Sequence, residues 1–348
     1  MGLWSFLQQL QGDPALAAAV FLTLAVVFVN GWTDAPNAIA TCIATRSMRP
    51  EPALLMAAVF NFSGAFVMTT FNSTVAQTVY HLADFGGDSR QALTALCAAL
   101  FSVVLWAVAA WRFGIPTSEG HAMLAGLSGA AAALQGGLSG INLEEWIKVL
   151  YGLLFSAVPG FLAGYFTVRL VEFLFRGCDR RKTGAFFGAA QSLGGAAMAF
   201  MHGAQDGQKF MAVFLLGLAL SQGKYGGEAF AVPIWLIALC SIVMALGTSL
   251  GGARIIKAVG MDMVRLSRHQ GFAADLAAAV CLLFSSLYGI PVSTTHVKTT
   301  AIMGVGASRR RSAVNWGAAS EMVWAWLLTF PGCGLIGFAA ARLLTAVF

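Results

Sequence analysis

Long apolar stretches alternate with short polar breaks along almost the whole chain. Most stretches reach the length of about 20 residues that a helix needs to cross the hydrocarbon core of a bilayer. We therefore predict ten helical spans, five in each half of the chain. Their expected positions are 14–45, 52–78, 91–113, 117–135 and 146–174, then 184–220, 229–252, 271–289, 292–307 and 314–346.

The chain carries little charge for its length. Of its 348 residues, 10% are charged and 58% are hydrophobic, and the mean hydropathy is +0.75. Soluble domains contain about 25% charged residues, so this composition cannot supply a soluble surface. It also excludes a disordered chain and a nucleic-acid-binding domain, and the six scattered cysteines do not form a disulfide scaffold. We predict an all-α polytopic membrane protein.

The first apolar stretch of each half is too long for a plain span, and each contains a polar insert. The inserts read GWTDAPN at 31–37 and GAQDGQK at 203–209. Both follow the pattern G-x-x-D-x-x-(N/K), with Asp34 and Asp206 standing 172 residues apart. Two copies of one unusual polar insert suggest that the halves of the chain are repeats.

A second pair of motifs supports this duplication. The motifs PTSEGH and PVSTTH end on His121 and His296, which stand 175 residues apart. Two motifs that recur in the same order at nearly the same offset indicate an internal duplication. We therefore expect a first repeat at 1–175, a short linker at 176–183 and a second repeat at 184–348.

Charged residues in the loops indicate how the repeats are oriented. Basic loops at 46–49, 254–268 and 309–311 have counterparts at 221–228, 81–90 and 136–148 that mix single basic residues with acids. Because lysine and arginine mark cytoplasmic loops, the two repeats must have opposite orientations, with the linker in the cytoplasm and both termini outside. This is the inverted-repeat architecture of secondary transporters, in which broken or half-membrane helices meet near the midplane.

Few ionisable residues fall securely inside the predicted spans. They are Asp34, Glu119, Asp206, Lys209 and Lys298. A charge in the bilayer core costs about 3 kcal/mol or more, so each needs a reason. Buried pairs that hold the bundle together are one interpretation, but they leave the second motif pair unexplained. For Lys298, two interpretations stay open: a pair with an acid, or a side chain that extends to the membrane interface.

The second motif pair predicts two helix N-termini at membrane depth. In each copy a proline precedes small hydroxyl residues, and a Gly/Ala-rich apolar segment follows. Serine and threonine cap helix starts, where proline is tolerated. A helix that starts inside the membrane points free N–H groups and about half a positive charge inward, which makes an anion site. The alternative is a pair of ordinary capped helices at the membrane surface.

Charge balance around such a site suggests coupled transport. A bound phosphate carries roughly one to two negative charges near neutral pH, and Asp34 and Asp206 add two more. Lys209 and the two helix ends do not balance this sum. Bound Na⁺ or H⁺ would neutralise the remainder in a low dielectric, as in a symporter. Phosphate is favoured over sulfate, because only a protonated phosphate donates a hydrogen bond to a carboxylate.

These motifs resemble those of the inorganic phosphate transporter (PiT) family over essentially the whole chain. The resembling segments are NGWTDAPNAIAT, GIPTSEGH, HGAQDGQK and GIPVSTTH. The resemblance implies phosphate uptake coupled to H⁺ or Na⁺, with Asp34 and Asp206 as the paired acids of the cation sites and Na⁺ as one candidate ion. The phosphate-binding residues that it implies are Asn37, Thr117, Ser118, Gln208, Lys209, Ser293, Thr294 and Thr295.

Three positions depart from the family pattern around the expected cation sites. Thr33 and Gln205 precede the two acids, where the family usually has asparagine. Glu119 stands where the family tends to have a small hydroxyl residue, and an extra acid beside an anion site suggests a proton-binding role. We assign these three residues to the coupling-cation site, and the coupling ion stays open between H⁺ and Na⁺.

Other functions fit the chain less well. A sulfate or related oxyanion symporter of the same fold is the nearest alternative. An anion channel would favour rings of positive charge, and an intramembrane hydrolase lacks the G-x-S-x-G and H-E-x-x-H motifs. We therefore expect no enzyme activity and no cofactor. The expected location is the plasma membrane, in contact with lipid. A metal–phosphate complex as substrate and a homodimer stay open.

Overall fold

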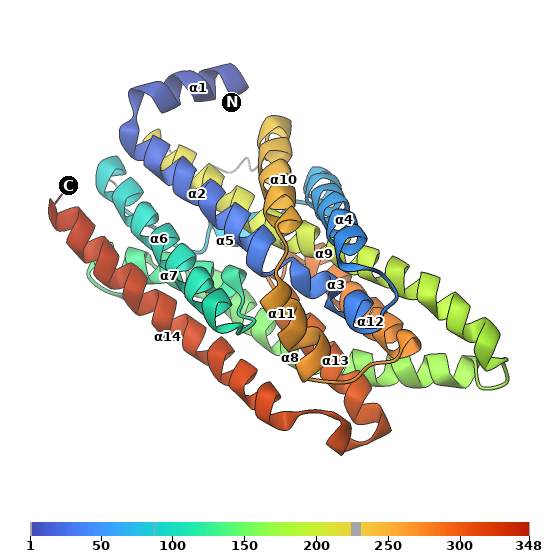
Figure 1. The fold of residues 1–348 in the computed structure, drawn as a ribbon. Helices are drawn as coiled ribbons and strands as arrows, with labels where there is room; N and C mark the ends of the chain where they lie inside the picture. The colour runs from blue at the N-terminus through green and yellow to red at the C-terminus, as the bar shows by residue number, and fades with distance from the viewer. Residues whose placement is uncertain (1, 87, 224–230, 348) are drawn as a thin grey trace.

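A computed structural model describes residues 2–86, 88–223 and 231–347 of the chain. Over these ranges the chain is almost entirely helical, and the only β-pairing is two isolated bridges. The helices form an elongated bundle with both termini near one end (Figure 1). Side chains 180–182 and most of the loop expected at 221–228 lie outside the described residues.

The helices follow the predicted spans closely. The first half contains α1 (Leu3–Gly12), α2 (Pro14–Thr33), α3 (Pro36–Ala44), α4 (Pro50–Phe71), α5 (Thr74–Tyr80), α6 (Ser89–Phe113), α7 (Glu119–Gln135), η1 (Leu138–Gly140) and α8 (Leu143–Leu174). The second half contains α9 (Arg180–Ser221), α10 (Ile234–Ser249), α11 (Ala253–Lys257), η2 (Ala258–Asp262), α12 (Arg268–Leu287), α13 (Thr294–Arg309), η3 (Arg311–Ala313) and α14 (Trp316–Val347).

Among the described residues, six helices are long and apolar enough to cross a membrane, or seven if a bent pair counts as one span. The bent pair joins Ile234–Ser249 to Ala253–Asp262 at an angle of 68°. The predicted number was ten. α7 and α13 fall short because they have only 17 and 16 residues, and α9, which contains the polar insert, is not among the six. These three helices contribute acids, lysines and hydroxyl groups to the site described below.

One of the two predicted polar inserts breaks its helix, and the other does not. α2 ends and α3 begins around Asp34, where Pro36 has no N–H to continue the ladder. The second insert lies inside the continuous helix α9, so the two inserts differ in backbone structure although their sequences look alike. Gln208 stands at the position equivalent to Pro36, and its N–H allows α9 to continue.

Helix packing repeats itself between the two halves. α2 packs against α6 and α10, and α9 packs in the same way against α12 and α4. The short helix α7 lies against α6 and α14, as α13 lies against α12 and α8. The second half begins at the end of the bundle opposite the N-terminus (Figure 1). The fold is therefore an all-α bundle of two inverted repeats whose last helices each pack against the short helix of the other repeat.

Glycines allow the two short helices to pack closely. A Cβ added at Gly129 of α7 would lie 2.1 Å from the carbonyl oxygen of Gly334, and one at Gly304 of α13 would lie 2.0 Å from that of Phe161. Real Cβ atoms do not approach a carbonyl oxygen so closely. The two glycines stand 175 residues apart, the offset of the second motif pair. Backbone contact thus fixes both short helices against α14 and α8.

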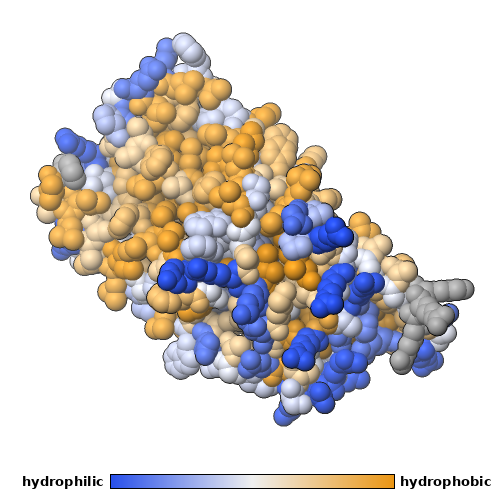
Figure 2. All heavy atoms as spheres, viewed as in Figure 1, coloured by the Kyte–Doolittle hydropathy of each residue, from blue (hydrophilic) through white to orange (hydrophobic). Residues whose placement is uncertain are grey.

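The surface of the bundle is apolar along its length and polar toward one end. Large hydrophobic side chains such as Phe21, Phe71 and Phe166 are exposed, as expected for a surface in contact with lipid. In Figure 2, hydrophilic residues gather toward the lower right, over the end opposite the termini. We call this end, with the loops 46–49, 263–267 and 309–315, the basic end.

Candidate functional site

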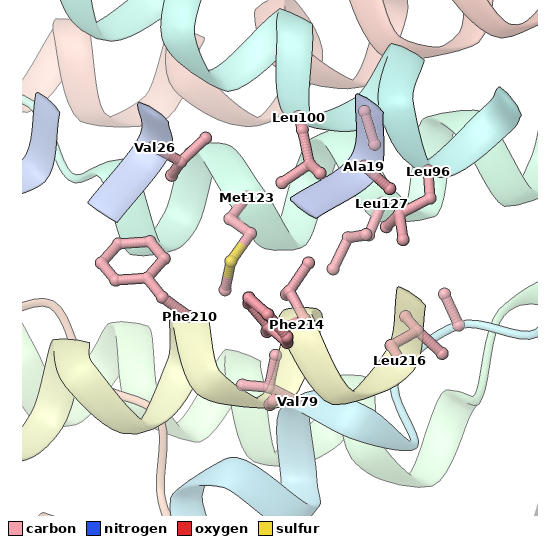
Figure 3. Close-up of a cluster of buried hydrophobic side chains, with 14 of the residues drawn as sticks. Ala19, Val26, Val79, Leu96, Leu100, Met123, Leu127, Phe210, Phe214 and Leu216 are labelled. Carbon is pink, nitrogen blue, oxygen red and sulfur yellow. The ribbon is translucent and has the colours of Figure 1, made fainter. Parts of the chain in front are cut away.

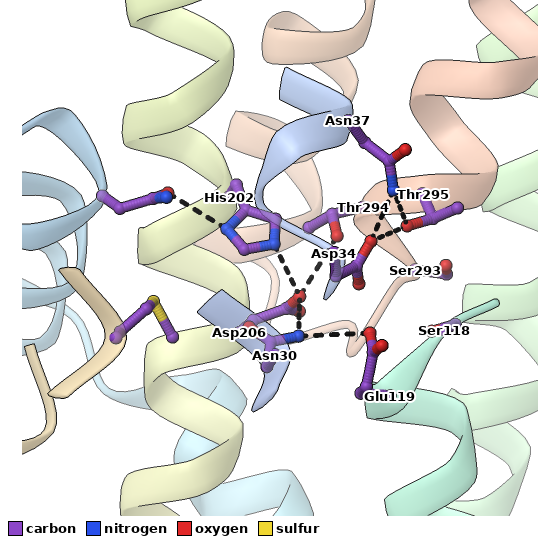
Figure 4. Close-up of polar contacts among 12 residues, drawn as sticks. Asn30, Asp34, Asn37, Ser118, Glu119, His202, Asp206, Ser293, Thr294 and Thr295 are labelled. Carbon is purple, nitrogen blue, oxygen red and sulfur yellow. Dashed lines mark hydrogen bonds and ion pairs between the residues drawn. The ribbon is translucent and has the colours of Figure 1, made fainter. Parts of the chain in front are cut away.

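Four elements bring their polar residues together in the middle of the bundle (Figure 4). The break between α2 and α3 contributes Asp34, and the first turn of α7 contributes Glu119. α9 contributes Asp206, and the first turn of α13 contributes Thr294 and Thr295. All five residues are buried. The two duplicated motifs therefore meet at one site, as predicted for an inverted repeat.

Asp34 is held by hydroxyl and amide donors. Asn37 donates from Nδ2 to Oδ1 of Asp34 at 2.7 Å and to the hydroxyl of Thr295 at 2.8 Å. The Thr295 hydroxyl donates to the same carboxylate oxygen. The other oxygen of Asp34, Oδ2, is buried without a hydrogen-bond partner among the described residues. Within the described part of the chain, this carboxylate therefore forms no ion pair, and one of its oxygen atoms is available as a ligand.

Asp206 is already paired with a cation of the protein. The ammonium of Lys209 lies 2.6 Å from Oδ1, and Nε2 of His202 lies 3.3 Å from Oδ2. The Thr294 hydroxyl donates to Oδ2 at 3.1 Å. Lys209 also donates to the carbonyl oxygen of Val292, just before α13. The two acids thus have different surroundings, although the sequence motifs around them look alike.

Glu119 lies on the α2 side of the site. The hydroxyl of Thr33 donates to its Oε1 at 2.6 Å. Asn30 donates from Nδ2 to Oε2 of Glu119 and to Oδ2 of Asp206, each at 3.4 Å. Through Asn30 the carboxylate of the first repeat is linked to that of the second. Glu119 therefore lies in the same polar cluster as the two aspartates, and Thr33 serves it as a hydrogen-bond donor.

Formal charges in the site do not cancel. Asp34, Asp206 and Glu119 carry three negative charges if ionised, and Lys209 supplies one positive charge in direct contact. The helix N-termini of α7 and α13 add about one positive charge between them. Burial of a net negative charge is unfavourable in a low dielectric unless cations bind. A cation bound beside these carboxylates would neutralise part of this charge.

The hydroxyl motifs form the two helix N-termini that the sequence predicts. Ser118 caps α7 by accepting the N–H of His121, and Ser293 caps α13 by accepting the N–H of His296. Both serines are buried, which excludes capped helices at the membrane surface. The first two N–H groups of each helix have no intrahelical acceptor, so each N-terminus can donate to an anion.

Three buried oxygen atoms around the helix break have no hydrogen-bond partner among the described residues. They are Oδ2 of Asp34 and the side-chain oxygens of Asn30 and Asn37. Carboxylate and amide oxygens are the ligands that hard cations prefer. One ligand atom from each of Asp34, His202 and Asp206 also lies within 4.8 Å of the others. The donor set fits a cation better beside Asp34 than beside Asp206, whose Oδ1 contacts Lys209.

Some predicted site residues make other contacts. Gln205 donates from Nε2 to the carbonyl oxygen of Ile290 at 3.2 Å, and Gln208 donates to that of Asn72 at 2.8 Å. Both retain a side-chain oxygen without a partner among the described residues. Thr117 is buried at the entrance to α7. The amide N–H groups of these glutamines therefore hold α9 against the segments that precede α13 and α5, while their side-chain oxygens remain available.

Two further residues lie in the polar site, although the sequence analysis did not assign them to it. Asn30 joins Glu119 to Asp206, and His202 joins Asp206 to Asn61 of α4 at 3.0 Å. His202 stands four residues before Asp206 on α9, a spacing that places both on one helical face. Asn30 likewise stands four residues before Asp34. This shared spacing was the available signal.

A helical bundle of inverted repeats, with a buried polar site at two helix N-termini, is a secondary transporter by its architecture. The model of the phosphate transporter family matches this chain twice, over residues 30–183 and 175–337. The chain belongs to this family, which is one of transporters and not of enzymes. The two matches overlap only around the expected linker.

Curated relatives and a solved structure agree with this membership. The chain is 38% identical over 324 residues to a probable low-affinity inorganic phosphate transporter of Rhizobium meliloti, covering 93% of this chain and 94% of the relative. It is 34% identical over 329 residues to one of Bacillus subtilis, covering 94% and 97%. A solved sodium-dependent phosphate transporter has the same fold, with a TM-score of 0.88, 22% identity and coverage of 97% and 100%.

The pairing of Lys209 with Asp206 predicts a pattern of stabilities. Lys209→Met leaves Asp206 buried without its cation, and we expect a loss of about 3–5 kcal/mol in the free energy of unfolding. The double variant Lys209→Met/Asp206→Asn should recover part of that loss, because it removes the uncompensated charge. Thermal unfolding of the purified variants in detergent measures both effects.

Lys148→Met is the matched control, because it breaks an exposed pair with Glu145 and should cost less than about 1 kcal/mol. A double variant no more stable than Lys209→Met alone would contradict the assigned pairing.

Proposed function

We propose that this protein imports inorganic phosphate together with H⁺ or Na⁺ by alternating access, as a secondary active symporter. The observation that carries the proposal is the juxtaposition of two capped helix N-termini with three buried carboxylates. The helix ends attract an anion, and the carboxylates attract cations. The names of the relatives support phosphate as the anion.

Phosphate binds, in this proposal, between the N-termini of α7 and α13. The hydroxyls and first-turn N–H groups at Thr117, Ser118, Ser293, Thr294 and Thr295 donate to its oxygens. A protonated phosphate oxygen can in turn donate to a carboxylate, which sulfate cannot do at neutral pH. Asn37, Gln208 and Lys209 line the same site in this proposal. Lys209 then shares its charge between Asp206 and the phosphate, from its position beside Val292.

The coupling cation binds beside Asp34 in this proposal. The unpartnered oxygens of Asp34, Asn30 and Asn37 supply its ligands. Asp206 contributes its negative charge at the opposite side of the site. Gln205, the preceding residue on α9, belongs to the cation site in this proposal. Na⁺ fits the oxygen donors, and the name of the solved structure with this fold supports Na⁺ as one candidate. H⁺ fits Glu119, an acid without a counterpart in the PVSTTH motif.

We further propose that the basic end faces the cytoplasm, which places both termini outside the plasma membrane. The repeats divide at 1–175, 176–183 and 184–348 in this proposal, which the overlap of the two family matches supports. The metal–phosphate complex as substrate and the homodimer stay predictions from the sequence.

Uptake of radiolabelled phosphate into proteoliposomes tests this function. We expect accumulation above equilibrium under an inward gradient of Na⁺ or H⁺, and little competition from excess unlabelled sulfate. Vesicles without protein are the control. Failure of both gradients to drive uptake would reject the symporter, and full competition by sulfate would point to a transporter of another oxyanion.

The number of coupled cations should depend on Glu119. Glu119→Gln retains a side chain that can accept from Thr33 and removes one negative charge from the site. We expect the variant to carry one cation fewer per phosphate. Under a tenfold cation gradient, its steady-state accumulation of phosphate should therefore fall by about tenfold.

The initial rate of exchange of internal for external phosphate should survive in this variant, because the anion site remains. If the variant accumulates phosphate to the same ratio of internal to external concentration as the wild type, the assignment of Glu119 to the cation site is contradicted.

A further inference from the structure

A second buried polar cluster lies next to the site, and its members have no role in the function proposed above. Lys298 of α13 forms an ion pair with Asp275 of α12, and both side chains are completely buried. The Thr41 hydroxyl of α3 donates to Asp275 at 2.8 Å, and Gln191 of α9 donates to it at 2.7 Å. Lys298 also lies 3.1 Å from the Thr41 hydroxyl. We call these four residues the lysine cluster.

The other repeat has only apolar residues at the equivalent positions. With the offsets of the two motif pairs, Lys298 and Asp275 correspond to Met123 and Leu100, and Gln191 corresponds to Ala19. These three residues are buried in one hydrophobic cluster, together with Val213 at the position of Thr41. Figure 3 shows Met123 between Phe210 and Phe214, and Ala19 beside Leu96 and Leu127. The duplicated fold therefore packs well without the lysine cluster.

Stability alone does not account for a buried ion pair at such a position. A buried pair is often no more stabilising than apolar residues of similar size, because two charges must be desolvated. The first repeat demonstrates such an apolar packing with methionine and leucine. The presence of the lysine cluster in one repeat only therefore suggests that transport requires the two sides of the site to differ.

The lysine cluster lies between the candidate site and the basic end. Lys298 follows Thr295 by three residues on α13, which is about 4.5 Å along the helix toward Arg309. Its ammonium also approaches the carbonyl oxygen of Ala38, the residue after Asn37 on α3. The cluster is thus one helical turn from the proposed phosphate ligands, on the side that leads to the basic end.

A cavity of about 950 Å³ lies at the basic end of α12 and α13. Its lining includes Gln270 of α12 and Gly306 of α13, together with three arginines and one acid, which are Arg265, Arg309, Arg310 and Asp262. Among the described residues, none of these three arginines forms an ion pair with a carboxylate. An anion that left the site along α13 would first meet Lys298 and then these guanidinium groups.

We propose that Lys298 is a binding residue for phosphate on its way between the central site and the basic end. The proposal rests on the function proposed above. When the basic side opens, the Lys298 ammonium leaves Asp275 and binds a phosphate oxygen, and Thr41 and Gln191 continue to hold the Asp275 carboxylate. When that side is closed, the ion pair re-forms and the cluster shuts the route. The apolar cluster around Met123 shuts the opposite side without a binding residue.

Transport measured from each face separately tests this proposal. The variant Lys298→Met, in full-length protein reconstituted with known orientation, takes the residue of the other repeat. We expect the phosphate concentration for half-maximal transport to rise roughly tenfold or more at the basic face, because one charged hydrogen bond is lost. The corresponding concentration at the opposite face should change by less than about twofold.

A double variant separates binding from folding. Lys298→Met/Asp275→Leu reproduces both residues of the first repeat, so it avoids an uncompensated buried aspartate. It should unfold at or near the temperature of the wild type and still show the weakened binding at the basic face. If Lys298→Met alone fails to fold, the double variant carries the test. Lys257→Met, which removes an exposed charge at the basic end, is the matched control.

Equal changes at both faces, or wild-type affinity at the basic face in the folded double variant, would overturn the proposal and leave the cluster a purely structural ion pair. Absence of phosphate transport by the wild-type protein in the same vesicles would instead reject the proposed function itself.

Discussion

The structure depends on the burial of unbalanced negative charge at the centre of a membrane bundle. Three carboxylates lie there against a single ammonium in direct contact, that of Lys209. A low dielectric makes this arrangement unfavourable by itself, so it calls for cations, and the helix N-termini of α7 and α13 call for an anion. Each type of ligand relieves the unfavourable charge left by the other. Coupling therefore follows from electrostatics at one site and needs no long-range signal.

The fold supplies what this electrostatic arrangement requires. Pro36 interrupts the helix beside Asp34, which places a carboxylate and two amide side chains where the backbone turns. Glycines 129 and 304 seat the two short helices against α14 and α8, so that their N-termini meet at the site. The two repeats share this framework. They differ where the second repeat buries the ion pair of Lys298 and Asp275 and the first repeat packs Met123 and Leu100.

Much of the site could be predicted from the sequence, because charge is scarce in this chain and two motifs recur. Those two facts brought Asp34, Asp206, Glu119 and the hydroxyl residues together and gave the correct helix N-termini at Ser118 and Ser293. Side-chain direction could not be predicted. The amide groups of Gln205 and Gln208 donate to backbone carbonyls, and Lys298 pairs with Asp275, twenty-three residues earlier on another helix. The continuity of α9 was predictable in principle, since Gln208 stands at the position that Pro36 occupies in the first repeat.

The most direct test of this account is the affinity of the purified protein for phosphate, measured by calorimetric titration at a series of Na⁺ concentrations and pH values. If cations neutralise the buried carboxylates, phosphate should bind at least about tenfold more tightly when the coupling cation is raised from scarce to saturating. Sulfate should bind more weakly than phosphate at each Na⁺ concentration near neutral pH, because it has no proton to donate to a carboxylate. An affinity for phosphate that is independent of both Na⁺ and pH would contradict the central claim.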